Sequence, residues 1–219
     1  ASLRCREGHA LELDCRDGSV AHVPFDLAAE DLALLVIDTK AKHSLDDGQY
    51  GARRAACERA AQILGVELLA DIAIEDLPQA LERLSSTDDA DELIKRTRHV
   101  VTEIDRTRRL VDLLQDGRPL RGEKLAEAGR LMDASHESLR VDYECTCPEL
   151  DVAVEAARAA GAHGARMTGG GFGGSAIALV DADAVHDVAR AVAEAYQREG
   201  FNPPAFLDAV PAAPAGRLA

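Results

Sequence analysis

A glycine-rich stretch from residue 166 to residue 175 constrains the fold of this chain more than any other feature. Five of its ten residues are glycine, and the next five, residues 176–180, read AIALV. A short, continuously apolar run of this kind has the composition of a buried strand. The glycines therefore form a loop that is held against a core, and the elements on either side of the loop have to be compatible with that position.

Two interpretations of the loop remain open from its own residues. Glycine adopts positive φ readily, and successive backbone N–H groups can then point the same way and form a concavity that suits a phosphate. The alternative is a flexible tight turn between two sheet strands, and the glycines alone favour neither. The loop is not a Walker loop, because no Gly-Lys-Ser/Thr follows it. It also fits the dinucleotide-binding fingerprint poorly, because a strand rather than a helix comes next.

Composition predicts a globular, soluble, cytoplasmic protein that binds neither nucleic acid nor membranes. The 219 residues are 47% hydrophobic, and the net charge of −14 opposes nonspecific contact with nucleic acid or anionic lipid. The longest apolar runs are too short to cross a membrane, and no signal peptide opens the sequence. The five cysteines are scattered, and Cys145 with Cys147 is a weak metal or redox pair, so we expect reduced thiols.

Hydrophobic periodicity predicts helices and strands in an α+β order without repeats or long linkers. A hairpin is expected over residues 9–25, a central apolar strand over 32–37 and an edge strand over 205–210. Two long helices, over 91–115 and 122–143, are expected to pack antiparallel. Further helices are expected over 44–65, 75–84, 148–161 and 185–199.

Several polar side chains on these helices are candidates for either structure or function. By helical spacing Tyr50 shares a face with Cys57, Ala61 and Leu64, so it is expected to point inward, as a core aromatic or as a ligand contact. Arg53 and Arg54 are expected on the solvated side. Two histidines, His99 and His136, fit surface or interhelical positions better than catalytic ones.

Five segments, taken in order, resemble the galactokinase branch of the GHMP small-molecule kinases. The most specific are residues 166–174 (RMTGGGFGG), which resemble the third motif of the family, and residues 131–140 (LMDASHESLR). The others are residues 43–54 (HSLDDGQYGARR), 99–103 (HVVTE) and 147–151 (CPELD). The resemblance covers nearly the whole chain, and the five segments together favour galactokinases over other GHMP kinases.

The resemblance implies the fold and the division of the chain. It implies a GHMP-kinase C-terminal domain over residues 39–210, with a ferredoxin-like antiparallel sheet and helices on one face. Residues 1–38 would then be the tail end of the N-terminal kinase domain, and residues 211–219 a flexible tail. In the family the first strands pair with the N-terminal domain, so the strand over residues 32–37 is expected to have an exposed edge and an apolar face. Weak stability or self-association would follow.

The resemblance also implies the site. The intact protein would phosphorylate galactose at its anomeric hydroxyl with ATP and Mg²⁺, and Tyr50 would lie against the sugar. The active-site loop beside the nucleotide would be Gly169, Gly170, Gly171, Phe172, Gly173 and Gly174. No residue is assigned as catalytic or as a metal ligand. Arg166 fits a salt bridge at least as well as a site role, and Asp38 is the best carboxylate by position without being assigned as the base.

The family motifs that these 219 residues do not contain set the expected activity. They are the sugar-binding Arg-x-Asn-x-Ile-Gly-Glu-His motif, a serine-rich glycine loop for the ATP phosphates, and the catalytic aspartate. In the family all three lie upstream of the position that Ala1 matches. The chain alone is therefore expected to be inactive, with the N-terminal half of the same protein as its partner. Two alternatives remain: a noncatalytic galactose- and ATP-binding regulator of the same fold, or a kinase for another sugar such as N-acetylgalactosamine.

Overall fold

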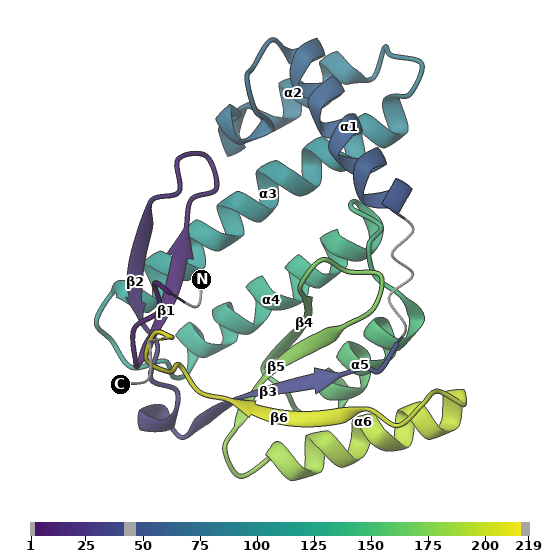
Figure 1. Cartoon of the computed structure of the whole chain (residues 1–219). Helices are drawn as coiled ribbons and strands as arrows, with labels where there is room; N and C mark the ends of the chain where they lie inside the picture. The colour runs from purple at the N-terminus through teal and green to yellow at the C-terminus, as the bar shows by residue number, and fades with distance from the viewer. Residues whose placement is uncertain (1–2, 42–46, 216–219) are drawn as a thin grey trace.

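The structure is a computed structural model that describes residues 3–41 and 47–215. Figure 1 shows a sheet with helices packed on it, and a separate hairpin. The strands are β1 (His9–Leu13), β2 (Val20–Pro24), β3 (Leu32–Asp38), β4 (Gly164–Thr168), β5 (Ser175–Asp181) and β6 (Ala205–Ala209). The helices are α1 (Asp47–Leu64), α2 (Leu77–Leu84), α3 (Ala90–Gln115), α4 (Glu123–Val141), α5 (Pro148–Ala159) and α6 (Val185–Glu199). Three short 3-10 turns, η1 (Ala28–Glu30), η2 (Leu69–Asp71) and η3 (Ile74–Asp76), complete the order.

These elements lie where the periodicity predicts them, to within a few residues. Pro148 is the first residue of α5, where its missing N–H costs nothing. Gly200, at φ 73°, ends α6 in the left-handed conformation that glycine adopts readily. Two positions named above lie outside the described residues: the predicted start of the first helix at Ser44, and Ala1, upstream of which the family base is expected. Within the described residues, no helix is both long and apolar enough to span a bilayer.

The main sheet has the strand order β4-β5-β3-β6, and every neighbouring pair is antiparallel. With α5 before β4 and α6 between β5 and β6, the chain follows the β-α-β-β-α-β path of a ferredoxin-like fold. Helices α1 to α4 are inserted between the first strand and α5. The α+β, ferredoxin-like prediction is therefore confirmed, and β6 is an edge strand as expected.

The strand β3 occupies the interior of this sheet, which corrects the expectation of an exposed edge. It pairs with β5 along its whole length, from Leu32 opposite Asp181 to Asp38 opposite Ser175. Its other edge pairs with β6. Both rows of backbone groups are thus satisfied by strands that lie far along the chain. The predicted division at residue 38 does not coincide with a division of the sheet, because β3 belongs to it.

The principal core lies between one face of the sheet and helices α5 and α6. The side chains of Leu35 and Ile37 in β3 pack there against α5 and α6 residues, and both are essentially inaccessible. Tyr196 of α6 is fully buried, and its hydroxyl donates to the Glu149 carbonyl at 2.6 Å. That bond satisfies the polar end of the ring, so burial of its large apolar surface carries no unpaired group.

Helix α4 lies along the edge strand β4 and satisfies its outward N–H groups (Figure 1). The Ala165 N–H donates to the Asp133 carboxylate at 3.0 Å, and the Met167 N–H donates to His136 Nδ1 at 3.2 Å. Because Nδ1 accepts, the proton of neutral His136 is on Nε2, which lies 3.3 Å from an Asp151 oxygen. His136 is therefore an interhelical residue, as predicted, and the sheet edge is closed.

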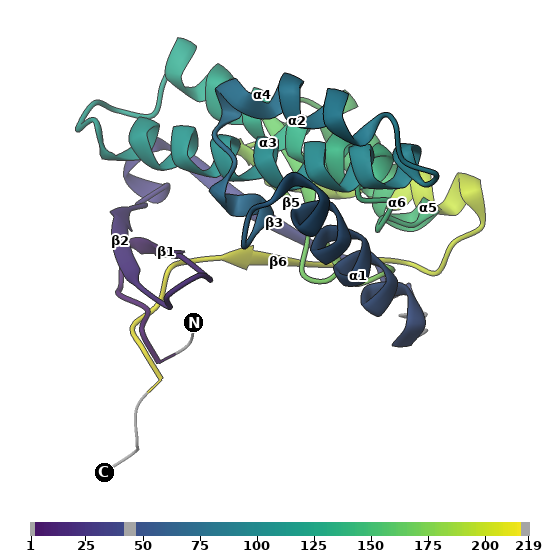
Figure 2. The ribbon, with the colours of Figure 1, turned by 90° about the horizontal axis from the view of Figure 1, so that it is seen from above.

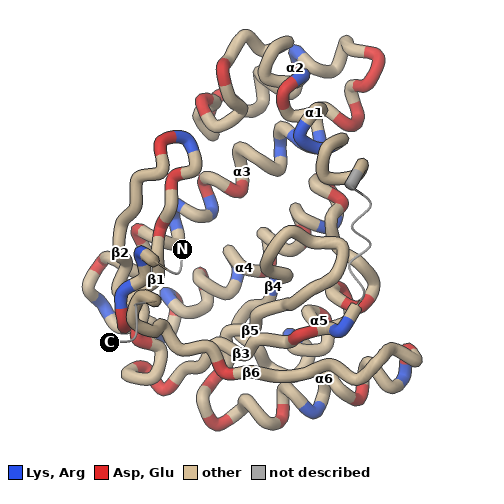
Figure 3. Tube along the Cα trace, in the orientation of Figure 1, with Lys and Arg blue, Asp and Glu red and all other residues tan. Residues whose placement is uncertain are grey.

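Helices α3 and α4 form the predicted antiparallel pair, and α1, α2 and α3 enclose a second core. Ala60, Leu84 and Leu93 are its most buried members. Figure 3 shows acidic and basic residues interspersed along α3 and α4. Between the two helices, Arg109 pairs with Glu127 at 2.5 Å.

The β1–β2 hairpin stands at one end of the molecule (Figure 2). Val23 is its buried residue, at 1% exposure. The contacts of the hairpin with the rest of the protein include packing of β2 on α3. The Pro211 carbonyl accepts a hydrogen bond from the Gly8 N–H at 3.3 Å. The first residue of the predicted tail is therefore tied to the hairpin, while residues 216–219 lie outside the described residues.

The close packing of α4 against the backbone just before β4 can be tested by placing alanine at each of two helical glycines. A Cβ on Gly129 would lie 1.8 Å from the His163 carbonyl oxygen, whereas a Cβ on Gly51 in α1 would meet nothing within 4 Å. We expect Gly129→Ala to lower the free energy of unfolding by about 2 kcal/mol or more, because backbone must move. Gly51→Ala should raise it by about 0.5–1 kcal/mol through helix propensity. Urea unfolding measures both, and equal effects would contradict the packing described here.

Candidate active site

The glycine loop, residues 169–174, connects β4 to β5 and depends on backbone conformations that favour glycine. Four of its residues have φ between 84° and 130°: Gly169, Gly171, Gly173 and Gly174. Phe172 adopts φ 57° although it carries a large side chain. Non-glycine residues persist in this region only when their surroundings hold them there.

Contacts on both sides fix the loop in place. The Phe172 N–H donates to the Cys145 carbonyl at 2.7 Å, and a Cβ on Gly171 would lie 2.3 Å from the same oxygen. At the other end, the N–H and the hydroxyl of Thr39 donate to the Gly174 carbonyl at 3.0 and 2.6 Å. The loop is thus a shaped element with defined neighbours, which fits a site wall better than a turn without anchors.

Tyr50 is exposed, which corrects the prediction that it points into the core. Its relative exposure is 65%, whereas Ala61 and Leu64, further along α1, are buried. The helix face meets the core only from Arg53 onward, so the ring of Tyr50 remains outside it. The ring lines an 830 Å³ hollow between the hairpin, α1 and α3, together with Tyr143 and His99.

The two neighbouring arginines of α1 differ from each other. Arg54 is exposed and pairs with Glu58 at 2.8 Å, as expected of a solvated face. Arg53 is only 9% exposed, so the prediction for it is wrong. It donates to the carbonyls of Tyr143, Glu144 and Gln49, and its guanidinium carbon lies 4.8 Å from the centre of the Phe172 ring. The signal was in the sequence, because Arg53 is in helical register with buried Ala56 and Ala60.

His99 is an interhelical residue, as predicted. Its ring is 8% exposed, stacks on Tyr143 with ring centres 4.4 Å apart, and shares a hydrogen bond with Ser138 of α4 at 2.9 Å. Burial lowers its pKa to about 4, because the charged imidazolium loses its hydration there. His99 is therefore neutral at physiological pH.

The two charged residues that flank the loop are engaged in ion pairs. Arg166 of β4 lies 3.2 Å from Glu103, whose carboxylate also binds Arg106 and the Ser135 hydroxyl. Asp38, at the end of β3, pairs with Lys40. Arg166 is thus in an ion pair that links β4 to α3, and Asp38 is in an ion pair with the nearby Lys40.

Cys15, Cys57, Cys145 and Cys147 are free thiols. Burial raises the pKa of the Cys145 thiol and of the Cys147 thiol to about 11, so both are protonated at neutral pH. Among residues 3–41 and 47–215, no group of three or more His, Cys, Asp and Glu side chains is arranged to hold a metal ion.

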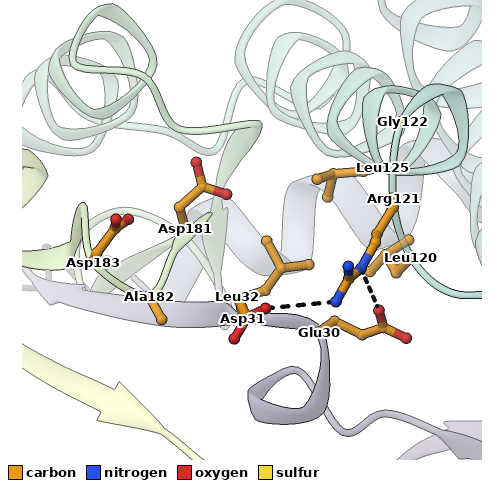
Figure 4. Close-up of a pocket in the computed structure, with 10 residues that line it drawn as sticks. All are labelled: Glu30, Asp31, Leu32, Leu120, Arg121, Gly122, Leu125, Asp181, Ala182 and Asp183. Atoms are coloured by element: carbon orange, nitrogen blue, oxygen red, sulfur yellow. Dashed lines mark hydrogen bonds and ion pairs between the residues drawn. The ribbon is translucent and has the colours of Figure 1, made fainter.

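A second hollow, of 530 Å³, lies at the opposite end of β3 from the glycine loop (Figure 4). Arg121 crosses it and contacts Glu30 at 3.1 Å and Asp31 at 3.5 Å. Since Leu32 opposes Asp181 here and Asp38 opposes Ser175 at the loop, the two ends are about 20 Å apart at the rise of a strand. This hollow is separate from the candidate site.

Comparison with known proteins identifies the class. Residues 118–198, from just before α4 almost to the end of α6, match the family described as GHMP kinases C terminal. The chain superposes with a TM-score of 0.86 on a crystal structure of Lactococcus lactis galactokinase complexed with galactose, at 33% identity, covering 97% of this chain and 53% of that one. A mevalonate kinase of L. major, at 19% identity and a TM-score of 0.51, shares the fold alone.

Sequence relatives point the same way. The chain is 50% identical over 218 residues to a galactokinase of Streptomyces coelicolor, covering 100% of this chain and 54% of the relative. It is 43% identical over 196 residues to a galactokinase of Homo sapiens, covering 89% of this chain and 47% of the relative. The chain thus spans about half the length of the curated relatives it matches.

The chain therefore carries the C-terminal domain of a GHMP kinase. Within that class, its sequence corresponds along its length to part of the galactokinases, which confirms the resemblance seen in the motifs.

The burial of neutral His99 makes a prediction about pH. The unfolded imidazole has a pKa near 6.5 and the folded one about 4, so between these values the unfolded state binds more protons. Stability from this group is complete above pH 6.5 and is lost as the pH falls toward 4, by up to about 3 kcal/mol. His99→Asn lacks this titrating group and should not show this loss. The difference in free energy of unfolding between the parent and His99→Asn should therefore narrow as the pH falls.

Urea unfolding of both proteins at pH 7, 6, 5 and 4.5 measures this gap. His186→Asn, at an exposed position of α6, is the matched control and should run parallel to the parent. A gap for His99→Asn that stays constant over the series would refute the assignment of a buried neutral imidazole.

Proposed function

We propose that these residues form the C-terminal part of the active site of a galactokinase, which transfers the γ-phosphoryl group of ATP to the anomeric hydroxyl of galactose with Mg²⁺. The similarity of the whole chain to galactokinases carries the proposal. The chain spans about half the length of those relatives. The proposal therefore concerns a protein in which these residues are joined to the N-terminal kinase half. The reaction would take place in the cytoplasm.

The geometry supports separate roles for the sugar side and the nucleotide side of this C-terminal part of the site. The exposed ring of Tyr50 offers an aromatic face at the start of α1, which suits packing against the apolar side of a sugar. One helical turn later, Arg53 contacts Phe172 of the glycine loop, so the sugar-side and nucleotide-side elements are neighbours. Residues 169–174 would then form one wall of the ATP site.

Phosphoryl transfer depends on positioning and on neutralising negative charge, and Mg²⁺ supplies much of the latter when bound. No residue of this chain is assigned to the metal or to proton transfer, because the resemblance implies that the base lies upstream of the position that Ala1 matches. The contribution of these residues is therefore orientation of the two substrates. Residues 39–210 would form the C-terminal domain together with β3, the residues before β3 would complete the N-terminal domain, and residues 211–219 would form a tail.

Substitution of Tyr50 tests the proposal in the protein that joins these residues to the N-terminal half. Tyr50→Ala should raise the KM for galactose about tenfold, the equivalent of about 1.4 kcal/mol of lost ring packing, with little change for ATP. Tyr50→Phe keeps the ring and should stay within about twofold of the parent. A coupled assay with galactose and N-acetylgalactosamine measures both. Absence of turnover would favour a noncatalytic regulator, and preference for the second sugar would favour the other kinase.

A further inference from the structure

The guanidinium of Arg53 is buried and bonded to backbone on two separate segments. Its Nε donates to the Tyr143 carbonyl at 2.7 Å, and Nη2 donates to the Glu144 carbonyl of the same segment. The remaining bond runs from Nη1 to the Gln49 carbonyl, one turn back in α1, at 3.0 Å. A planar fork that donates in three directions fixes the segment around residue 144 relative to α1.

The same guanidinium lies over one side chain of the glycine loop, the ring of Phe172. Its central carbon lies 4.8 Å from the centre of the Phe172 ring, within the range of a cation–π contact. Phe172 and Glu144 both adopt left-handed conformations, at φ 57° and 53°. Two of the four described non-glycine residues with positive φ are thus in direct contact with this one side chain. Such conformations require support from their surroundings, and Arg53 supplies it to both.

The two supported residues are also joined to each other. Cys145, next to Glu144, accepts the Phe172 N–H at 2.7 Å through its carbonyl, and the same carbonyl leaves no room for a Cβ on Gly171. Displacement of the segment around residue 144 would therefore displace the loop. Arg53 acts on the loop in two ways, by its ring contact and through the Cys145 carbonyl.

We propose that Arg53 is a positioning residue that holds the glycine loop in its nucleotide-binding conformation from helix α1. This inference rests on the proposed function, because it takes residues 169–174 to be the nucleotide side of the site. Arg53 itself is buried and acts through Phe172 and the Cys145 carbonyl. Tyr50, three residues earlier on a neighbouring position of α1, serves the sugar.

The charge of Arg53 adds an electrostatic component. Its bonds go to carbonyls, and among residues 3–41 and 47–215 no carboxylate forms an ion pair with it. Carbonyl dipoles stabilise the cation without cancelling its unit charge. A positive charge of low exposure beside the loop favours an anionic ligand there, because screening by water is weak.

Steady-state kinetics of Arg53→Lys in the protein with its N-terminal half test the positioning role. Lysine keeps the charge but loses the fork and the flat contact with Phe172. We expect the KM for ATP to rise about tenfold or more, with the KM for galactose within about twofold. Arg59→Met, at an exposed position of α1 paired with Asp89, is the control and should match the parent. An equal rise for both substrates, or a rise for galactose alone, would overturn the proposal.

Hydrogen exchange separates this proposal from the galactokinase assignment, because it needs no turnover. Amides of residues 169–174 should exchange about tenfold faster or more in Arg53→Lys, while those of α6 keep the parental rates. Phe172→Leu, which keeps the backbone geometry and removes the ring, should act in the same direction and serves if Arg53→Lys does not fold. Unchanged exchange in the loop of a folded variant would show that Arg53 does not position it, whether or not the protein phosphorylates galactose.

Discussion

The antiparallel pairing of β3 with β5 is the interaction on which the rest of this structure depends. Its register sets Asp38 opposite Ser175, which brings Thr39 to the Gly174 carbonyl across 135 residues of sequence. The same register turns Leu35 and Ile37 toward α5 and α6. A slip by one residue would reverse both faces of β3 and release the loop from Thr39. Core packing and the position of the glycine loop are therefore one constraint.

Helix α4 carries that constraint from the sheet to the other helices. On its sheet side, Asp133 and His136 bind the edge of β4, and Gly129 allows the two backbones to approach. On its other side, Ser135 and Ser138 bind Glu103 and His99 of α3. These side chains recur within three turns of one helix, so small residues and polar residues there have distinct, necessary positions. This arrangement explains why residues 131–140 are a specific signature although none of them is assigned to substrate.

Sequence reasoning recovered the elements and the fold but not the environment of particular side chains. Helical periodicity located α3, a continuous apolar run located β5, and the motifs identified the family. It failed for Tyr50, because spacing gives the face of a helix but not where along the axis the neighbouring core begins. It failed for Arg53, because a charged side chain was expected in solvent although its helical spacing from Ala56 and Ala60 indicates the buried face. It left β3 with a free edge, because its pairing with β6 joins distant residues that no local pattern reports.

The electrostatics of the loop follow from how each nearby cation is partnered. The chain has a net charge of −14, so an anion approaching it meets an unfavourable field overall. Arg166 shares the Glu103 carboxylate with Arg106, and Lys40 pairs with Asp38. Arg53 instead satisfies its donors with carbonyls, a solution that keeps a buried guanidinium hydrogen-bonded and leaves its charge in place. A carboxylate in place of those carbonyls would cancel the local positive charge, so in the proposed site this choice of acceptor would favour a phosphate-bearing ligand.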